Sequence, residues 1–324
     1  MKNNNQISEK NIIHNYLSKL NDNKYESFNF KNDAAFLKVP KSTKIVVTND
    51  TIVESVDFFK NDSPESIATK IATYNLSDIS AMGSSPYAYT LSLSLPSKIN
   101  KEWIKKFTNR LLKIQKKYNF FLLGGDVSKS NKIVISSNFF GYIKKGKILT
   151  RSGCKKNDDI WVTGNLGNSA IGLKIIQKKI KTNILYKKYF INKYLYPIHC
   201  HIGYRINEFA SSAIDISDGF YGDLEKLLNE NKLGASISSN TFPFSNKTKN
   251  LIKKRLVKVD YLLTAGDDYQ LIFTAKPSKY LNIKRIAAET NIKITKVGNI
   301  IDKKGIYIDN QSINIVNKSF EHFF

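Results

Sequence analysis

The chain has 324 residues, of which 41% are hydrophobic, and this length exceeds the usual limit for one hydrophobic core, so we expect two domains. Its formal net charge of +24 comes from lysines scattered along the whole length, without a basic block or a groove-reading motif, so a dedicated nucleic-acid-binding protein is not indicated. No apolar run approaches the roughly 20 residues of a membrane span, and the first residues lack the apolar stretch of a secretory signal, so we expect a cytoplasmic protein without a membrane partner.

The first part of the chain alternates strand-like runs with helical patterns, which predicts mixed α/β structure. The clearest runs are strands at Ile45–Val47, Thr90–Leu95 and Ile133–Phe140 and a helix at Trp103–Tyr118. The segment Lys144–Lys147, which contains a glycine, is the expected linker. An N-terminal domain is therefore predicted over residues 1–145.

A second helix is predicted from Ser63, which can cap its start, to Gly83, which can end it. Asp78 lies on the apolar stripe of this helix, between Tyr74 and Met82, and no lysine or arginine stands three or four residues away. A carboxylate that points inward requires compensation, either by a metal ion or by backbone hydrogen bonds from a neighbouring loop.

Beyond the linker, a second α/β domain is predicted over residues 146–324. Its expected elements are strands at Ile160–Thr163, Ala213–Ile216 and Tyr261–Leu263 and a helix at Tyr221–Asn229. The intervening Gly164 and Gly167 match neither the P-loop nor the dinucleotide fingerprint, so we leave them out of the candidate site.

One local pattern recurs: an apolar run is followed by a short polar segment with aspartate, as in IVVTND, FFLLGGD, SAIDISDG and YLLTAGDD. In α/β proteins, ligands commonly bind beyond the carboxyl ends of strands, where loops bring polar groups together. Aspartate carboxylates, with the oxygens of neighbouring threonine and asparagine, are hard ligands that suit Mg²⁺. We therefore predict a magnesium-dependent enzyme that moves a phosphoryl group on a small molecule.

Each of these segments also has a local interpretation, which stays open. Asp50 can serve as a turn residue, and Ser217 or Asp218 can cap the following helix. For Gly125 the functional interpretation is that a glycine lets the backbone approach a ligand closely. Arg151 suits a phosphate or a surface ion pair.

Other catalytic chemistries lack their motifs in this chain. There is no GxSxG elbow, no HExxH, no P-loop and no protein-kinase signature. The two cysteines, Cys154 and Cys200, show neither disulfide nor metal-ligand spacing, and the four histidines lie apart from the aspartate segments. Because phosphoryl transfer depends on positioning and charge neutralisation, we predict no general base and no covalent nucleophile.

The order of the motifs resembles the thiamine-monophosphate kinase family nearly from end to end. The matching segments are NDAAFL, TNDTIVESVDFF, NLSDISAMGSSP, GGD, LTRSGCKKNDDIWVTG, GNSAIGL, DISDG, GDDYQLIF and FEHFF. The resemblance implies the two-domain α/β fold of the aminoimidazole ribonucleotide synthetase superfamily, with the N-terminal domain forming a homodimer. It implies transfer of phosphate from ATP to thiamine monophosphate, giving thiamine diphosphate, the last step in making that compound.

The resemblance also implies site residues and partners. It places several Mg²⁺ ions at Asp33, Thr48, Asn49, Asp50, Asp78, Asp126, Asp215 and Asp218. It places the co-substrate ATP at Gly125, Asp126, Arg151 and Ser217, and thiamine monophosphate at Asp57, Asp267 and Phe320.

Several positions depart from the family pattern. Asn32 stands where the family usually has an aspartate, Asn49 replaces a serine or threonine, and Asp57 replaces a histidine. Asp267 replaces the glutamate of the family's GGEDY motif, which shortens a substrate contact. The substrate contacts are therefore the part of the implied site that these replacements affect most.

Two alternatives remain at this point. One is a sister synthetase of the same superfamily, although a selenophosphate synthetase would carry a reactive cysteine near its N-terminus and no cysteine here precedes Cys154. The other is a basic nucleic-acid-binding protein on an inactive kinase fold, whose binding would weaken steeply with salt.

Overall fold

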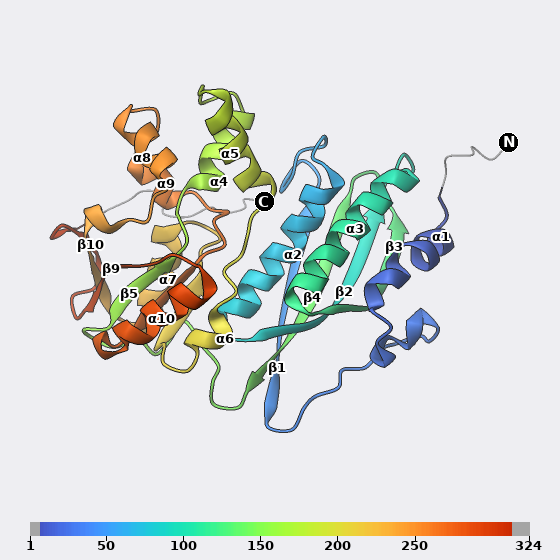
Figure 1. Ribbon diagram of the computed structural model, residues 1–324, viewed down its shortest axis with the longest axis horizontal. Coiled ribbons are helices and arrows are strands. Elements are labelled where there is room, and N and C mark those ends of the chain that lie inside the picture. Colours follow the sequence, from blue (N-terminus) through green and yellow to red (C-terminus); the bar gives the residue numbers. More distant parts are fainter. Residues whose placement is uncertain (1–6, 313–324) are drawn as a thin grey trace. The chain divides into compact units, whose positions relative to one another are not determined.

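The computed structural model describes residues 7–312. By its internal contacts the chain forms two compact units (Figure 1). The N-terminal unit comprises the residues up to Ile79 together with Ser84–Lys145, and the C-terminal unit comprises Ser80–Gly83 together with the residues from Gly146 onward. Within the described range, no helix is both long enough and apolar enough to cross a membrane.

The N-terminal unit is built on a four-stranded sheet in the order β1-β4-β2-β3. Its strands are β1 (Thr43–Val53), β2 (Ser85–Leu95), β3 (Phe121–Lys129) and β4 (Val134–Lys144). Strand β4 pairs antiparallel with β1 and β2, whereas β2 and β3 are parallel. Strands β1 and β3 therefore form the two edges of the sheet.

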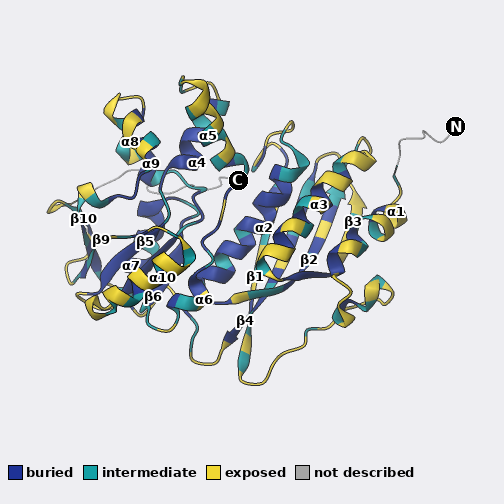
Figure 2. Cartoon of the chain, viewed as in Figure 1, coloured by how far each residue is buried: buried dark blue, intermediate teal, exposed yellow. Residues whose placement is uncertain are grey.

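Two long helices, α2 (Pro64–Ala81) and α3 (Lys101–Tyr118), lie side by side over this sheet (Figure 1). The side chain of Asn100 caps α3, and its residues buried at helical spacing, such as Ile104, Phe107 and Leu111, form its inner face. Helix α2 is buried along most of its length, while α3 exposes its outer face (Figure 2). The short elements before β1 are α1 (Glu9–Asn15) and the 3-10 helices η1 (Leu17–Asn21) and η2 (Tyr25–Phe30).

The C-terminal unit contains a sheet that has seven strands within the described residues, in the order β11-β10-β7-β9-β5-β8-β6. The strands are β5 (Asp159–Thr163), β6 (Ser212–Asp215), β7 (Gly234–Ile237), β8 (Leu271–Ala275), β9 (Ile294–Ile301), β10 (Gly305–Ile308) and β11 (Gln311–Ser312). Only the β7–β10 pair is parallel among these described strands.

Both faces of this sheet are covered, as strand β5 illustrates. Ile160 and Val162 belong to one hydrophobic cluster, and Trp161 between them belongs to another, because alternate side chains of a strand point to opposite faces. The covering elements are α4 (Asn168–Ile176), α5 (Ile184–Leu195), α6 (Gly203–Ile206), α7 (Phe220–Asn231), η3 (Ser239–Thr241), α8 (Asn246–Lys253), α9 (Val259–Thr264), η4 (Pro277–Lys279) and α10 (Tyr280–Thr290).

The mixed α/β fold class is confirmed, and most predicted elements are present. The predicted strand Tyr261–Leu263 is wrong, because these residues form helix α9. The expectation that each aspartate follows the end of a strand is also wrong for three of the four segments, since Asp267 and Asp268 follow helix α9. Asp50 lies inside β1 and Asp126 inside β3, whereas Asp215 is the last residue of β6.

Candidate active site

Three of the predicted metal-binding side chains lie between strand β1 and helix α2 in the N-terminal unit. Thr48 and Asp50 stand two residues apart on β1, so their side chains point to the same face of the strand. The Thr48 Oγ1 donates a hydrogen bond of 2.5 Å to Oδ2 of Asp78 on α2. The predicted inward position of Asp78 thus brings it to the strand that carries Asp50.

The carboxyl group of Asp50 is poorly compensated at this position. Its Oδ2 atom is buried and has no hydrogen-bond partner within the described part of the chain. Burial, and then the nearby carboxylates of Asp78 and Asp57, raise the pKa of Asp50 to about 7. A divalent cation among these oxygens would reduce the repulsion between the carboxylates and would give the Asp50 Oδ2 a partner. The residues present therefore fit Mg²⁺.

Asn49 points to the opposite face of β1 from Thr48 and Asp50. Its Nδ2 donates to Oδ1 of Asn138 at 2.9 Å and to the carbonyl of Ser137 at 3.2 Å, both on strand β4. The structure therefore does not bring the Asn49 side chain together with the other predicted metal ligands of β1.

Asp57 lies in the turn after β1, and a buried lysine holds this turn. The Asp57 Oδ2 accepts a hydrogen bond of 2.7 Å from the Val53 amide. The Nζ of Lys70, whose residue is only 1% exposed, donates to the Asp57 carbonyl at 2.7 Å. Lys70 was missed from the sequence, although its position three residues after Ile67 places it on the apolar face of α2.

A second group of predicted residues lines a cavity of about 460 Å³ in the N-terminal unit. Asp33 reaches it from the segment before β1, and Gly124, Gly125 and Asp126 reach it from β3. Most of the remaining lining is apolar, including Phe36. The cavity therefore combines two carboxylates and a glycine pair with an apolar wall.

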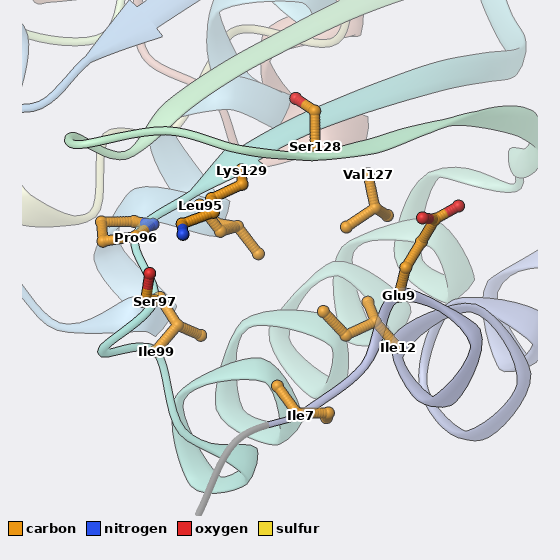
Figure 3. Close-up of a pocket in the computed structure, with 10 residues that line it drawn as sticks. All are labelled: Ile7, Glu9, Ile12, Leu95, Pro96, Ser97, Ile99, Val127, Ser128 and Lys129. Atoms are coloured by element: carbon orange, nitrogen blue, oxygen red, sulfur yellow. The ribbon is translucent and has the colours of Figure 1, made fainter. Parts of the chain in front are cut away.

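Another cavity of the N-terminal unit, of about 350 Å³, contains none of the predicted site residues. Side chains from α1, from the end of β2 and from β3 line it, and the charged residues among them are Glu9 and Lys129 (Figure 3). The remaining lining residues are Ile7, Ile12, Leu95, Pro96, Ser97, Ile99, Val127 and Ser128.

In the C-terminal unit, the loop after β6 packs against the loop before β8. The Asp267 amide donates to the Ser217 carbonyl at 2.9 Å, and the Tyr269 amide donates to the Ile216 carbonyl at 2.8 Å. These bonds bring Ser217 and Asp218 together with Asp267. Arg151 is exposed, and its carbonyl accepts a hydrogen bond from Asn231.

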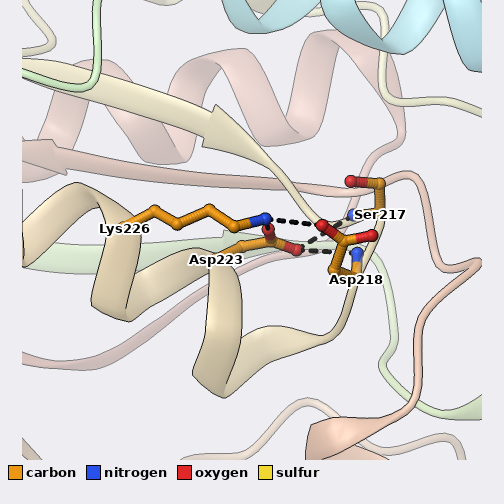
Figure 4. A network of polar contacts seen from close by, with 4 residues as sticks. All are labelled: Ser217, Asp218, Asp223 and Lys226. Carbon is orange, nitrogen blue, oxygen red and sulfur yellow. Dashed lines mark hydrogen bonds and ion pairs between the residues drawn. The ribbon is translucent and has the colours of Figure 1, made fainter. Parts of the chain in front are cut away.

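The alternative interpretation, in which Ser217 or Asp218 caps the helix after β6, is wrong. The N-cap of α7 is Gly219, and the carboxylate of Asp223 in the first turn accepts the amides of Ser217 and Asp218 (Figure 4). Lys226, one turn further along α7, pairs with both Asp218 and Asp223. Asp223 was missed from the sequence, where its only signal is an acid in the first turn of a helix.

Asp268, next to the predicted substrate residue Asp267, is a second acid that was missed. It is 8% exposed, and its Oδ2 accepts a hydrogen bond of 2.8 Å from the Gly167 amide at the start of α4. Burial raises its pKa to about 8, and the negative charge of Asp267 adds to the rise, against the lowering effect of the Gly167 and Ser169 amides.

This pKa predicts a pH dependence of stability. Because the pKa of Asp268 is higher in the folded chain than in the unfolded one, ionisation opposes folding, so stability falls as the pH rises from about 4 to about 8. Asp268→Asn removes the ionisable group, and with it this cost of ionisation in the folded chain. The unfolding free energy of the variant relative to the wild type should therefore increase between pH 5 and pH 8, by at most about 1.4 kcal/mol per pH unit, in urea titrations. A difference that does not change with pH would contradict the prediction.

Comparison with known proteins relates these groups to a family. The model of the AIR synthase related protein, N-terminal domain, matches residues 31–143. The thiamine-monophosphate kinase of Buchnera aphidicola subsp. Acyrthosiphon pisum is 36% identical over 90% of this chain and 91% of its own length. The chain belongs to the thiamine-monophosphate kinase family. The prediction of an enzyme of this family is thereby confirmed.

Solved structures of thiamine-monophosphate kinases share the fold. The enzyme of Stenotrophomonas maltophilia K279a is 30% identical with a TM-score of 0.81, covering 87% of this chain and 90% of its own. AaThiL in complex with AMPPCP and TMP is 26% identical with a TM-score of 0.77, covering 90% of this chain and 91% of its own. The two-domain fold of the aminoimidazole ribonucleotide synthetase superfamily is therefore confirmed.

The predicted Mg²⁺ ligands of this chain are divided between its two units. Between residues 7 and 312, no group of three or more histidine, cysteine, aspartate or glutamate side chains is arranged to hold a metal ion. Two carboxylates with a hydroxyl, as at Thr48, Asp50 and Asp78, match the way Mg²⁺ usually binds, with water and substrate phosphates as its other ligands. Phe320 lies outside the described residues, so its prediction stays a prediction.

Proposed function

We propose that this chain transfers the terminal phosphoryl group of ATP directly to the phosphate of thiamine monophosphate, giving thiamine diphosphate and ADP, with Mg²⁺. The observation that carries the proposal is the buried, unpartnered Oδ2 of Asp50 beside Asp78, where a cation would be expected. The names of the relatives and the AMPPCP and TMP bound to AaThiL support the choice of substrates.

The acids of the N-terminal unit have a clear task in such a reaction. The chemistry that Mg²⁺ supplies is neutralisation of the negative charge on the phosphoryl groups. Asp50 and Asp78 would hold the cation, and the Thr48 hydroxyl fixes the Asp78 carboxylate by its hydrogen bond. The acceptor phosphate is already ionised near neutral pH, so no side chain has to remove a proton.

The cavity on β3 suits the nucleotide. Its apolar wall would suit a base or ribose, and Asp33 and Asp126 would hold Mg²⁺, which would neutralise the charge of the phosphates. A side chain at Gly125 would place its Cβ 1.8 Å from the Leu91 carbonyl oxygen, so only glycine keeps the backbone of β3 in this position. Asp126 is thereby held at the cavity.

The remaining assignments follow the family resemblance. We assign Mg²⁺ also to Asp215 and Asp218, ATP to Gly125, Arg151 and Ser217, and thiamine monophosphate to Asp57, Asp267 and Phe320. Asn49 is left out, because its side chain is hydrogen-bonded on the opposite face of β1. We further propose that the enzyme acts as a homodimer and performs the last step of thiamine diphosphate synthesis. Light scattering of the purified protein tests the dimer.

Turnover by the purified protein tests the central proposal. ADP release should require both Mg²⁺ and thiamine monophosphate, and thiamine diphosphate should appear in equal amount. Thiamine without its phosphate is the matched control and should give no ADP, because it lacks the ionised acceptor oxygen. ADP release that is independent of thiamine monophosphate would contradict the assignment.

A further inference from the structure

Asp223 is a buried acid with no role in the proposed reaction. It lies in the first turn of α7, and its side chain is 1% exposed. Its Oδ2 accepts hydrogen bonds from two consecutive amides, those of Ser217 at 3.1 Å and Asp218 at 3.0 Å (Figure 4). One oxygen atom thus fixes the backbone of both residues that were assigned to ATP and Mg²⁺.

Lys226 compensates the charge of this buried acid. Its Nζ lies 2.9 Å from Oδ1 of Asp223 and 2.5 Å from Oδ2 of Asp218, so one ammonium group joins both carboxylates. Burial raises the pKa of Asp223, and the hydrogen bond and charge of Lys226 act in the opposite direction. The Asp218 side chain is thereby held as well as its backbone.

The other side of the same loop is held by close backbone contacts. Gly219 has a φ of +116°, and a Cβ there would lie 2.6 Å from the Thr264 carbonyl oxygen. A Cβ at Gly266 would lie 2.0 Å from the Ser217 carbonyl oxygen. The Ser217–Asp218 loop is therefore held on one side by the close backbone approaches at Gly219 and Gly266, and on the other side by the Asp223 carboxylate.

We propose that Asp223 is a positioning residue for Ser217 and Asp218, with Lys226 as its counter-charge. Asp223 acts through two other residues: it orients Ser217, which is assigned to ATP, and Asp218, which is assigned to Mg²⁺. The inference rests on the proposed function for what the loop binds. It differs from a simple helix-stabilising role, because it requires Mg–ATP affinity to depend on the two amide hydrogen bonds.

The test compares three variants with the wild type. Asp223→Ala removes the acceptor, and Asp223→Asn keeps one oxygen that can accept both amides. Asp159→Ala is the matched control, because Asp159 is also a buried acid of the C-terminal unit, paired with Lys296 at 2.6 Å on neighbouring strands. The measurements are amide hydrogen exchange, the Kd for Mg–ATP by calorimetry, and the unfolding temperature.

Asp223→Ala should speed exchange at Ser217 and Asp218 about tenfold or more, and should raise the Kd for Mg–ATP by a similar factor. Asp223→Asn should recover most of both properties. Asp159→Ala should lower the unfolding temperature while leaving the exchange of the loop amides and the Kd unchanged.

Two results would overturn the inference. The first is an Asp223→Ala protein with wild-type exchange at both amides. The second is faster exchange with an unchanged Kd, because the loop geometry would then not matter for binding. A wild-type protein that binds no Mg–ATP is a failure of the proposed function instead, and amide exchange alone then decides whether Asp223 orders the loop.

Discussion

Replacing Asp50 or Asp78 with asparagine is expected to lower the rate of ADP formation about a hundredfold or more, at saturating substrates. Asparagine keeps the shape of the side chain but removes the negative charge that, in the proposed function, holds a cation. Asp50→Asn should at the same time unfold at a temperature no lower than that of the wild type near pH 8. Burial and two carboxylates already oppose ionisation of Asp50 in the folded chain, as its pKa of about 7 indicates.

Activity and stability should therefore move independently in this variant. The matched control is Thr51→Ala. Thr51 is exposed on the opposite face of β1 from Asp50, and its Oγ1 donates to Ser136 on strand β4. Steady-state kinetics at several Mg²⁺ concentrations measure the effect. Wild-type rates in both Asp50→Asn and Asp78→Asn would show that this group holds no catalytic cation.

The second large effect, on both stability and Mg–ATP binding, is expected from adding one methyl group at Gly125. Gly125→Ala would place a Cβ 1.8 Å from the Leu91 carbonyl oxygen, so either β3 or β2 has to move. Overpacking of this kind usually costs about 1–3 kcal/mol, and here the clash is with backbone that cannot rotate away. We expect this loss of unfolding free energy in urea titrations, together with a Kd for Mg–ATP that rises at least about tenfold.

The neighbouring glycine provides the matched control. A Cβ at Gly124 meets no atom within 4 Å, although Gly124 lines the same cavity. Gly124→Ala should therefore change stability by less than about 0.5 kcal/mol, as surface substitutions usually do. Equal destabilisation by the two substitutions would mean that the close approach of Gly125 to Leu91 is not what holds β3 in place.

Helix α2 shows how much local sequence determines in this protein. The Ser63 hydroxyl accepts the Ser66 amide, as the predicted cap requires, and Gly83 at the helix end has a φ of +73°. Helical spacing alone predicted that Asp78 points inward, and the half-buried side chain does lie against β1, where it accepts the Thr48 hydrogen bond. Caps and periodicity act within a few residues, so the sequence carries them fully.

Elements defined by distant partners were less accessible. The apolar run before Asp50 stops at Val47, but β1 continues to Val53 because β4 pairs with it along its whole length. The run at Tyr261 is short and apolar, a pattern that fits a strand or a buried helix equally, and α9 forms there. Strand length and element type at such places depend on the neighbour, which a local pattern does not contain.

The sequence by itself determined the α/β class and the family and supplied the acids predicted for the candidate site, because the motifs are local and their order is specific. Tertiary structure alone decided how those acids are grouped and what holds them. Because side chains alternate along β1, Asn49 points away from Thr48 and bonds to β4. Lys70 donates a hydrogen bond to the backbone of the Asp57 turn. The amides of Ser217 and Asp218 donate to the Asp223 carboxylate. Hydrogen bonds to buried charges depend on which segments meet in space, and only the folded chain specifies that.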